Sequence, residues 1–471
     1  MKELEKSGER ATKVWVLALV SAASFMVFLD AMVVTTALST IRRDLNASIE
    51  ALEWTVNAYN LSFAVLLLTG AALGDRLGRR RMFAAGLALF VAASAACALA
   101  GSAPWLIAAR ALQGAGAALV MPLAMTLLST AFPREQRAKA LGIYSSVSGL
   151  ALIAGPAVGG AITQGFAWQW IFWINIPIGL VVIPLALARI PESHGPRARL
   201  DLGGIALAAG AALGLAWGLM RANTAGWSSF EVVAALTAGI VLAVAFVMWE
   251  MRVREPMMPM RLFRSRAFSS GIVASFLFYA AMYGVLFLLP QFLQVAQGHD
   301  PIGTGLRLLT WTATLFVFAP IGGTLVNRVG ERALVVGGVF LQVIGFAWIA
   351  AVAAPDLAYV RLVTPLILAG TGVSMAMPAV QNAILGAVAA SDVGKASGTF
   401  NTLRFLGAVF GIAVLGAVFA GNGSADSPQA FSAGFVPAIG VSACLSLIAA
   451  IAGLWLPGRR SVVLLQAPAK A

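Results

Sequence analysis

A few ionisable residues stand inside long apolar runs, where a charged side chain is costly and is a candidate for a role in function. Asp30 is the only acid well inside such a run, and Arg110 and Arg404 are cations in similar surroundings. A carboxyl group in this setting can take up and release a proton, and a nearby guanidinium can hold its charge. These residue types therefore indicate ion or proton coupling, with Arg110 as the natural partner of Asp30.

Asp30 and Arg110 are expected at the same depth. We place the first apolar span at 14–36, running outward, so Asp30 lies about 9 Å from its outer end at a rise of about 1.5 Å per residue. The fourth span runs inward from Trp105, so Arg110 lies about 8 Å below the same surface. The alternative is a static ion pair that only holds two helices together. Other acids are expected at span ends, where water can reach them: Glu53, Asp201, Glu231 and Glu250.

Other kinds of chemistry find little support in the sequence. His194 and His299 fall in loops, and the two cysteines sit in separate apolar runs, so neither a metal site nor a disulfide framework is expected. The segment around Lys395 lacks the upstream glycine and the hydroxyl residue of a phosphate-binding loop. We therefore expect no cofactor, no metal and no ATP drive. A membrane-embedded enzyme or a sensor is the less favoured alternative, because clustered catalytic groups and a soluble output domain are absent from the sequence.

The elements that must position these residues are membrane helices. Of the 471 residues, 60% are hydrophobic and 11% are charged, whereas soluble domains are about 45–50% apolar and about 25% charged. Apolar runs of about 20 residues can cross a bilayer, and the chain contains fourteen candidate runs. The net charge of +13 falls in clusters between these runs. Such clusters set orientation in a bilayer and give no support to binding of nucleic acid.

The distribution of basic residues predicts the orientation. Most of the 32 Lys and Arg residues lie in the N-terminus and in alternate connections, which places both termini in the cytoplasm. The basic N-terminus followed by an apolar run could pass for a secretory signal. That run is too long for a signal core and is followed by another span, so we interpret it as a retained first helix.

The chain repeats itself. Four residues recur later with the same spacing: Gly114, Gly116, Met121 and Pro122 match Gly370, Gly372, Met377 and Pro378. Spans one to six thus correspond to spans nine to fourteen in the same orientation, a pattern typical of transporters with a binding site between the halves. The predicted segments are a cytoplasmic N-terminus (1–13), a six-helix bundle (14–188), a cytoplasmic linker (189–200), two inserted transmembrane helices (201–249), a basic cytoplasmic linker (250–267), a second six-helix bundle (268–456) and a cytoplasmic tail (457–471).

Three motifs carry a family resemblance. The first span ends in Leu29-Asp30-Ala31-Met32-Val33-Val34-Thr35-Thr36-Ala37-Leu38, and the loop after span two reads Leu73-Gly74-Asp75-Arg76-Leu77-Gly78-Arg79-Arg80-Arg81. Span five contains Gly149 and then Gly155-Pro156-Ala157-Val158-Gly159-Gly160. Together they resemble the major facilitator superfamily, and within it the fourteen-span drug:proton antiporters of the EmrB/QacA type. The aromatic segment from Trp168 to Pro177 also resembles the family's entry into the sixth span. Two departures are Ala71, where the loop motif usually opens on glycine, and Gln169, where a basic residue is common in that aromatic segment.

The resemblance implies residue roles. Asp30 and Arg110 would couple transport to protons, and Arg404 would be a structural charge. The residues that match the cytoplasmic loop motif are Asp75, Arg76, Gly78, Arg79 and Arg80. We expect this loop to act as a latch between the halves, with a topology anchor as the alternative, and we expect a cationic partner for Asp75. The residues that match the antiporter motif are Gly149, Gly155, Pro156, Gly159 and Gly160.

The resemblance also implies a fold and a function. The expected fold is that of an all-α polytopic membrane protein with two pseudo-symmetric six-helix bundles plus two extra central transmembrane helices. The expected activity is export of amphipathic drugs or toxic compounds, cationic or neutral, in exchange for protons by alternating access. The alternative is a dedicated exporter of one metabolite, such as an antibiotic made by the host. The expected partners are a small amphipathic substrate, protons and the lipid bilayer. We expect a multi-pass monomer in the cytoplasmic membrane of a bacterium.

Overall fold

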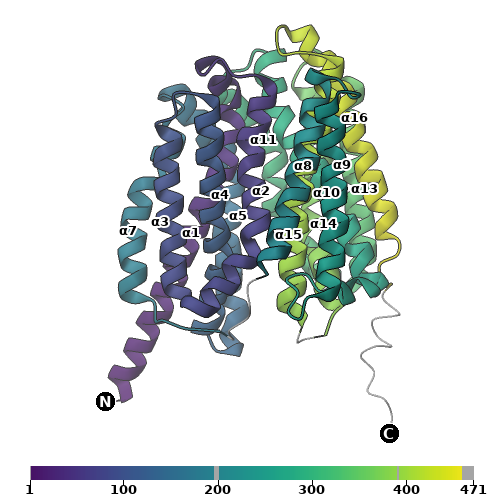
Figure 1. Ribbon diagram of the computed structural model, residues 1–471. Coiled ribbons are helices and arrows are strands. Elements are labelled where there is room, and N and C mark those ends of the chain that lie inside the picture. Colours follow the sequence, from purple (N-terminus) through teal and green to yellow (C-terminus); the bar gives the residue numbers. More distant parts are fainter. Residues whose placement is uncertain (1, 196–200, 390–391, 459–471) are drawn as a thin grey trace. The chain divides into compact units, whose positions relative to one another are not determined.

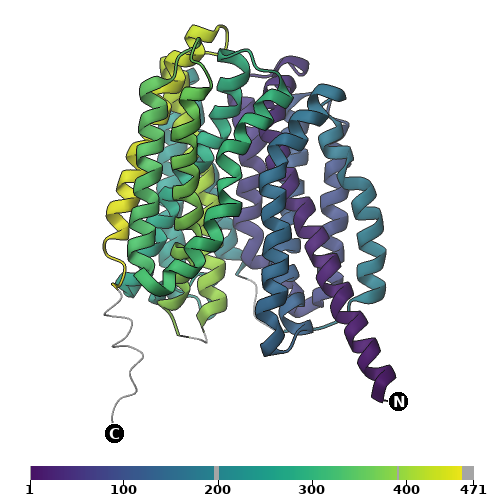
Figure 2. The ribbon, with the colours of Figure 1, turned by 180° about the vertical axis from the view of Figure 1, so that it is seen from behind.

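The structure is a computed structural model that describes residues 2–195, 201–389 and 392–458. Its regular elements, across these residues, are helices that run alongside one another within each half of the chain (Figures 1 and 2). Fourteen helical segments in the described part are long and apolar enough to cross a membrane. The predicted all-α class and the predicted number of spans are therefore confirmed.

The chain divides into two compact units. Unit 1 comprises Met1–Ala209 and Asp300–Leu306. Within it, α2 and α3 pack against α4, and α5 packs against α1. The helices that lie wholly in unit 1 are α1 (Lys2–Asp44), α2 (Ile49–Leu77), α3 (Arg79–Ala98), α4 (Ala103–Ala131), α5 (Arg134–Gly165), α6 (Trp170–Trp173) and α7 (Asn175–Arg189).

Unit 2 comprises Gly210–His299 and Arg307–Ala471. Two helices, α8 (Leu202–Ala225) and α11 (Pro301–Thr312), begin in unit 1 and end in unit 2. In unit 2, α10 packs against α15 and α16, and α13 packs against α14 and α16. The remaining helices are α9 (Phe230–Arg252), the 3-10 helix η1 (Met260–Arg264), α10 (Arg266–Gln291), the π-helix η2 (Phe292–Ala296), α12 (Thr314–Val329), α13 (Glu331–Val352), α14 (Val360–Gly386), α15 (Val393–Asn422) and α16 (Pro428–Gly453).

The repeated glycines allow close contact between helices in both units. In unit 1, a side chain on Gly114 would collide with the backbone of α2 at Tyr59, and one on Gly116 would collide with α3 at Phe90. In unit 2 the equivalent glycines lie on α14. A side chain on Gly370 would collide with α11 at Trp311, and one on Gly372 would collide with α13 at Gly338. Small residues let helix backbones approach closely inside a membrane. Each unit therefore holds one glycine-bearing helix tightly between two neighbours.

Two span boundaries differ from the prediction. The first helix continues past residue 36 to Asp44, whose carboxylate accepts a hydrogen bond of 2.6 Å from the indole of Trp168. The sixth span is broken at Ile174 into α6 and α7. Pro177 has no N–H to donate to the carbonyl of Trp173, which removes one helical hydrogen bond at this break.

The helices α8 and α9 bury little of their surface. In the most apolar 18-residue stretch of α9, only 11% is buried inside the structure. In the corresponding stretch of α8, 22% is buried. They approach each other closely at Gly214 and Gly239, where the two backbones meet. Their broad exposed apolar faces suit contact with lipid.

Candidate functional site

The structure brings Asp30 and Arg110 together within unit 1. Arg110 Nη1 donates to Asp30 Oδ2 at 2.6 Å. Both side chains are buried, with exposed fractions of 1% for Arg110 and 0% for Asp30. We predicted a contact between Asp30 of α1 and Arg110 of α4 because the two residues were expected at the same depth, and this contact is present. Its role in transport stays a prediction.

Three further polar residues complete a network around Asp30. Gln113 Nε2 and Asn175 Nδ2 donate to Asp30 Oδ1 at 2.7 and 2.9 Å. Ser94 Oγ accepts from the same two amides, at 3.3 and 2.9 Å, and donates to the carbonyl of Phe172 at 2.9 Å. The carboxylate of Asp30 therefore accepts three hydrogen bonds from α4 and α7.

Sequence reasoning missed these three residues, although weak signals were present. Gln113 follows Arg110 by three residues, which places both on one face of α4. Asn175 is a polar residue in an aromatic, apolar stretch. Neither signal names a partner, because an uncharged polar residue in a membrane helix often bonds within its own helix.

Arg110 is held on its other side by α2. Its Nε donates to the carbonyl of Thr55 at 3.3 Å, and its guanidinium lies 4.3 Å from the centre of the Tyr59 ring. Its Nη1 also donates to Gln113 Oε1 at 2.7 Å. A buried ion pair repays the cost of leaving water only when such extra hydrogen bonds are present. Hydrogen bonds with Gln113, Asn175 and the carbonyl of Thr55 provide this compensation for the pair.

Part of the expected antiporter motif presses α5 against α1 beside Asp30. A side chain on Gly155 would collide with Met32, and one on Gly159 would collide with the backbone of Val33. Gly160 meets the backbone of Pro301 in the same unit. Pro156 lies inside α5, and its carbonyl would be met by a side chain on Gly305 of α11. The approaches at Gly155 and Gly159 hold α5 against the turn of α1 that follows Asp30.

Gly149 differs from the other motif residues. A side chain on Gly149 would meet open space, with no atom within 4 Å. Close helix packing in this conformation therefore does not explain why position 149 is a glycine. Its predicted place in the motif rests on the sequence alone.

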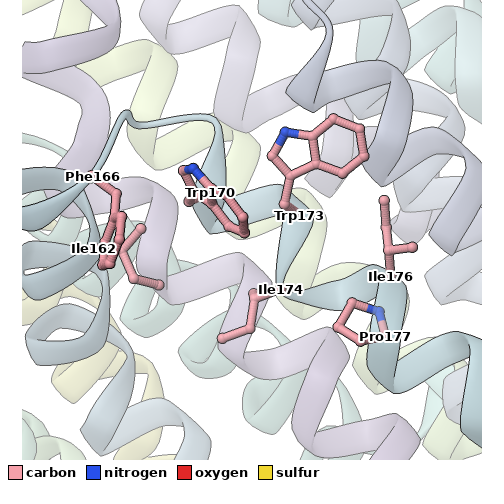
Figure 3. A pocket seen from close by; sticks show the side chains of 7 residues that line it. All are labelled: Ile162, Phe166, Trp170, Trp173, Ile174, Ile176 and Pro177. Atoms are coloured by element: carbon pink, nitrogen blue, oxygen red, sulfur yellow. The ribbon is translucent and has the colours of Figure 1, made fainter.

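An apolar hollow lies on unit 1 where α5 meets α6 and α7 (Figure 3). It measures about 500 Å³. The residues that line it are Ile162, Phe166, Trp170, Trp173, Ile174, Ile176 and Pro177. Asn175 lies between two of these lining residues, and its amide bonds Asp30 in the interior. The break at Ile174 thus turns one polar side chain inward and leaves an aromatic surface outside.

The cytoplasmic loop motif forms a compact cluster with the segment after α7. Arg79 Nε donates to Asp75 Oδ1 at 2.8 Å, so Asp75 has a cationic partner one turn along the chain. The backbone of Arg79 donates to the carbonyl of Ser193 at 2.9 Å, and the N–H of Gly195 donates to the carbonyl of Asp75 at 3.0 Å. Arg76 is exposed.

Glu192 closes this cluster and was not predicted. Its carboxylate accepts from the backbone N–H groups of Arg80 and Arg81 at 3.0 and 3.3 Å, at the start of α3. A negative charge is favourable at a helix N-terminus. Gly78 joins α2 to α3 with φ +107, a conformation that other residues rarely adopt, and a side chain there would strike Glu192. In the second unit Gly330 has a similar φ of +86, while the side chain of Asn327 lies outside the described part.

The loop motif gives a testable expectation. We expect Asp75→Asn and Gly78→Val to slow transport in liposomes while substrate binding stays largely intact, because both changes disturb the loop and leave the Asp30 network untouched. Transport rate and binding are measured on the same preparations, with exposed Glu255→Gln as the matched control. Wild-type transport by both variants would show that the loop is only a topology anchor.

The expectation that acids at span ends are reached by water is wrong for three of the four. Glu53 and Glu250 are each 3% exposed, and Asp201 is 9% exposed. Glu250 Oε2 accepts from the N–H of Met258, and Asp201 Oδ1 accepts from the N–H of Gly204, so neighbouring backbone replaces water. Glu53 lies on a buried face of α2, and its Oε2 has no hydrogen-bond partner among the described residues. Asp30 is therefore not the only buried acid in a span.

The described residues contain no cluster of three or more His, Cys, Asp or Glu that could hold a metal ion. The two cysteines are free. Arg404 lies in unit 2 and is buried, and its guanidinium stacks 4.5 Å from the ring centre of Tyr279. It takes no part in the Asp30 network.

Comparison with known proteins decides the family. The family model described as Major Facilitator Superfamily matches residues 20–412. The chain belongs to the Major Facilitator Superfamily. As a Major Facilitator Superfamily member whose described part contains fourteen helices long and apolar enough to cross a membrane, it is a multi-pass membrane protein of a transporter family.

Relatives and solved structures agree with this assignment. The chain is 35% identical to "Multidrug resistance protein Stp" of Mycobacterium tuberculosis, over 84% of this chain and 74% of the relative. It is 34% identical to "Cephamycin export protein CmcT" of Amycolatopsis lactamdurans, over 95% and 93% of the two chains. The crystal structure of a D-xylose-proton symporter superimposes with a TM-score of 0.69 at 15% identity, covering 94% and 98% of the two chains. At that identity the symporter shows the shared fold alone.

Proposed function

We propose that this chain is a secondary active exporter that expels amphipathic drugs or toxic compounds in exchange for protons. The family and the relatives, which are named for multidrug resistance and for cephamycin export, support export as the direction of transport. The proposal involves no enzymatic reaction and no cofactor. The observation that carries it is the buried pair of Asp30 and Arg110, with further hydrogen bonds to Asp30 from Gln113 of α4 and Asn175 of α7.

The geometry of the pair suggests how coupling works. Asp30 is sealed from solvent, so a proton can reach it only in another conformation of the cycle. Protonation would neutralise the carboxylate, weaken its bonds to Arg110 and loosen α1 from α4. Release of that proton on the opposite side would restore the pair. Because linkage is reciprocal, a substrate that binds the charged form must expel a proton when it binds.

Two kinds of exporter fit the comparisons. A multidrug exporter accepts many amphipathic compounds, and the Mycobacterium tuberculosis relative is named a multidrug resistance protein. A dedicated exporter moves one compound, as the cephamycin export protein is named to do in Amycolatopsis lactamdurans. We favour the multidrug exporter and keep the dedicated exporter of a host-made antibiotic as the second candidate.

Transport by purified protein in liposomes tests the proposal. The lumen is loaded with a panel of cationic and neutral amphipathic dyes and antibiotics, and a pH gradient is imposed in either direction. We expect several compounds to move against their gradients only when protons flow the other way. Movement of one compound alone would favour the dedicated exporter, and transport that ignores the pH gradient would overturn proton coupling.

The proposed setting is the cytoplasmic membrane of a bacterium, with a monomeric chain, both termini in the cytoplasm and two six-helix bundles at 14–188 and 268–456. We expect reporter fusions after Arg81, Lys139 and Arg199 to report the cytoplasm, because the basic connections are retained there. Fusions near Ser102 and Ser424 are expected to report the exterior. Arg199 lies outside the described residues. An exchange of sides between the two groups would contradict this orientation.

A further inference from the structure

Arg404 is a buried cation in the interior of unit 2. It is 9% exposed. Its guanidinium lies 4.5 Å from the ring centre of Tyr279 and 5.3 Å from that of Phe405, and the hydroxyl of Tyr283 is within hydrogen-bonding reach. An aromatic face attracts a guanidinium and offsets part of the cost of burying it. The arrangement holds the cation in place without neutralising it.

The helices that pack against α15 supply no opposite charge. In unit 2, α15 contacts α10, α14 and α16, and none of these four helices contains an Asp or a Glu. Arg110 differs sharply, because it bonds Asp30 directly. A buried charge with no counter-ion carries a large desolvation cost. Unit 2 therefore holds a positive charge that a bound anionic group would stabilise.

Other polar groups on α10 and α15 also lack partners. Five buried side-chain atoms on these two helices have no hydrogen-bond partner among the described residues: Ser275 Oγ, Tyr279 Oη, Thr399 Oγ1, Thr402 Oγ1 and Arg404 Nε. All five can donate a hydrogen bond. Buried polar atoms are normally satisfied, so a set of free donors on two packed helices needs an explanation. Carboxylate, sulfonate and phosphate oxygens accept such bonds.

The depth of Arg404 narrows the choice of anion. Arg404 lies about 17 Å along α15 from the first residue of that helix, and Tyr279 lies about 20 Å along α10, at a rise of about 1.5 Å per residue. Both residues stand near the middle of their helices. A lipid phosphate stays at the membrane surface. A group that enters with a transported compound can reach this depth.

We propose that Arg404 and the hydroxyl group of Tyr279, whose ring lies beside it, bind an anionic substituent, a carboxylate or similar group, of the compounds that the chain transports. The inference rests on the proposed function and deepens it. It extends the substrate class from cationic and neutral amphiphiles to zwitterionic and anionic ones. Arg404 then recognises substrate, where the sequence predicted only a structural charge.

The test uses three probes that share one apolar fluorescent body. They are dansylglycine, which carries a carboxylate, its neutral methyl ester, and a dansyl trimethylammonium cation. Binding to the full-length protein in lipid nanodiscs is followed by dansyl fluorescence. We expect the wild type to bind dansylglycine about tenfold more tightly than the ester, as a charge-assisted hydrogen bond in a buried site contributes at least about that factor.

Variants assign the preference to Arg404. Arg404→Gln should weaken dansylglycine binding about tenfold and leave ester binding unchanged, while Arg404→Lys should keep part of the preference. Unchanged ester binding shows that the variant is folded. Arg361→Gln, at an exposed arginine of α14, is the matched control and should bind all three probes as the wild type does. If Arg404→Gln does not fold, Tyr279→Phe, which removes one free donor and keeps the ring, should lower the preference several-fold.

The possible results separate this inference from the proposed function. Equal affinity of the wild type for dansylglycine and its ester, or binding of neither, would overturn the anion site. A preference that survives in both Arg404→Gln and Tyr279→Phe would do the same. Transport of the three probes in liposomes with a pH gradient is measured in parallel. Gradient-driven transport without a carboxylate preference leaves export standing and removes this inference, whereas a preference in binding without gradient-driven transport removes the proposed exporter.

Discussion

Asp30→Asn is expected to reduce transport driven by a pH gradient to the background of empty liposomes. Asparagine fills the same space and can take part in the hydrogen bonds of the network, but it cannot bind and release a proton at physiological pH. The fold should therefore persist while coupling is lost. Asp30→Glu keeps a carboxyl group with one extra methylene, so we expect it to retain part of the transport.

The control for this experiment is Asp356→Asn, an exposed acid outside the network. It should transport as the wild type does. Substrate-driven counterflow without a pH gradient shows whether Asp30→Asn still binds and moves substrate. Gradient-driven transport by Asp30→Asn at the wild-type rate would mean that Asp30 and Arg110 form only a static pair.

Arg110→Ala is expected to destabilise the protein strongly and to impair coupling. Removing one partner of a buried ion pair leaves the other charge uncompensated, which typically costs about 3–5 kcal/mol. The carboxylate would keep its bonds to Gln113 and Asn175 and lose its only cation in the network. Thermal unfolding in detergent measures the first effect, and transport under a pH gradient measures the second.

The double variant Asp30→Asn with Arg110→Ala distinguishes the effect of losing the ion pair from the effect of leaving one charge buried alone. With neither charge present, most of the lost stability should return, while gradient-driven transport should stay absent. A double-mutant cycle of unfolding temperatures gives the interaction between the two residues. A double variant as unstable as Arg110→Ala alone would show that the instability comes from lost packing against Tyr59.

The sequence predicted the membrane helices well, because a long apolar run has few alternatives to a spanning helix. It was weaker on where helices end. The first span was placed at 14–36, yet α1 continues through Arg42 and Arg43 and ends at Asp44. Nothing local in the sequence shows that the indole of Trp168, far along the chain, bonds the carboxylate of Asp44.

The candidate site was predictable only where charge marked it. Asp30 and Arg110 stood out because charges are rare inside spans, and the direction of each helix gave their depths. Gln113, Asn175 and Ser94 carry no charge, and their meeting depends on how α3, α4 and α7 pack. The burial of Glu53 depends on the face of α2 that it occupies, and position along a helix does not predict that.

Proton release on substrate binding tests the central claim most directly. Detergent-solubilised protein in weakly buffered solution is mixed with a substrate identified in the liposome assay, and the pH of the solution is followed with an indicator dye. The account predicts that the wild type releases protons in proportion to the substrate bound, and that Asp30→Asn binds substrate and releases none. Release by Asp30→Asn equal to that of the wild type would contradict the account and assign coupling to another group.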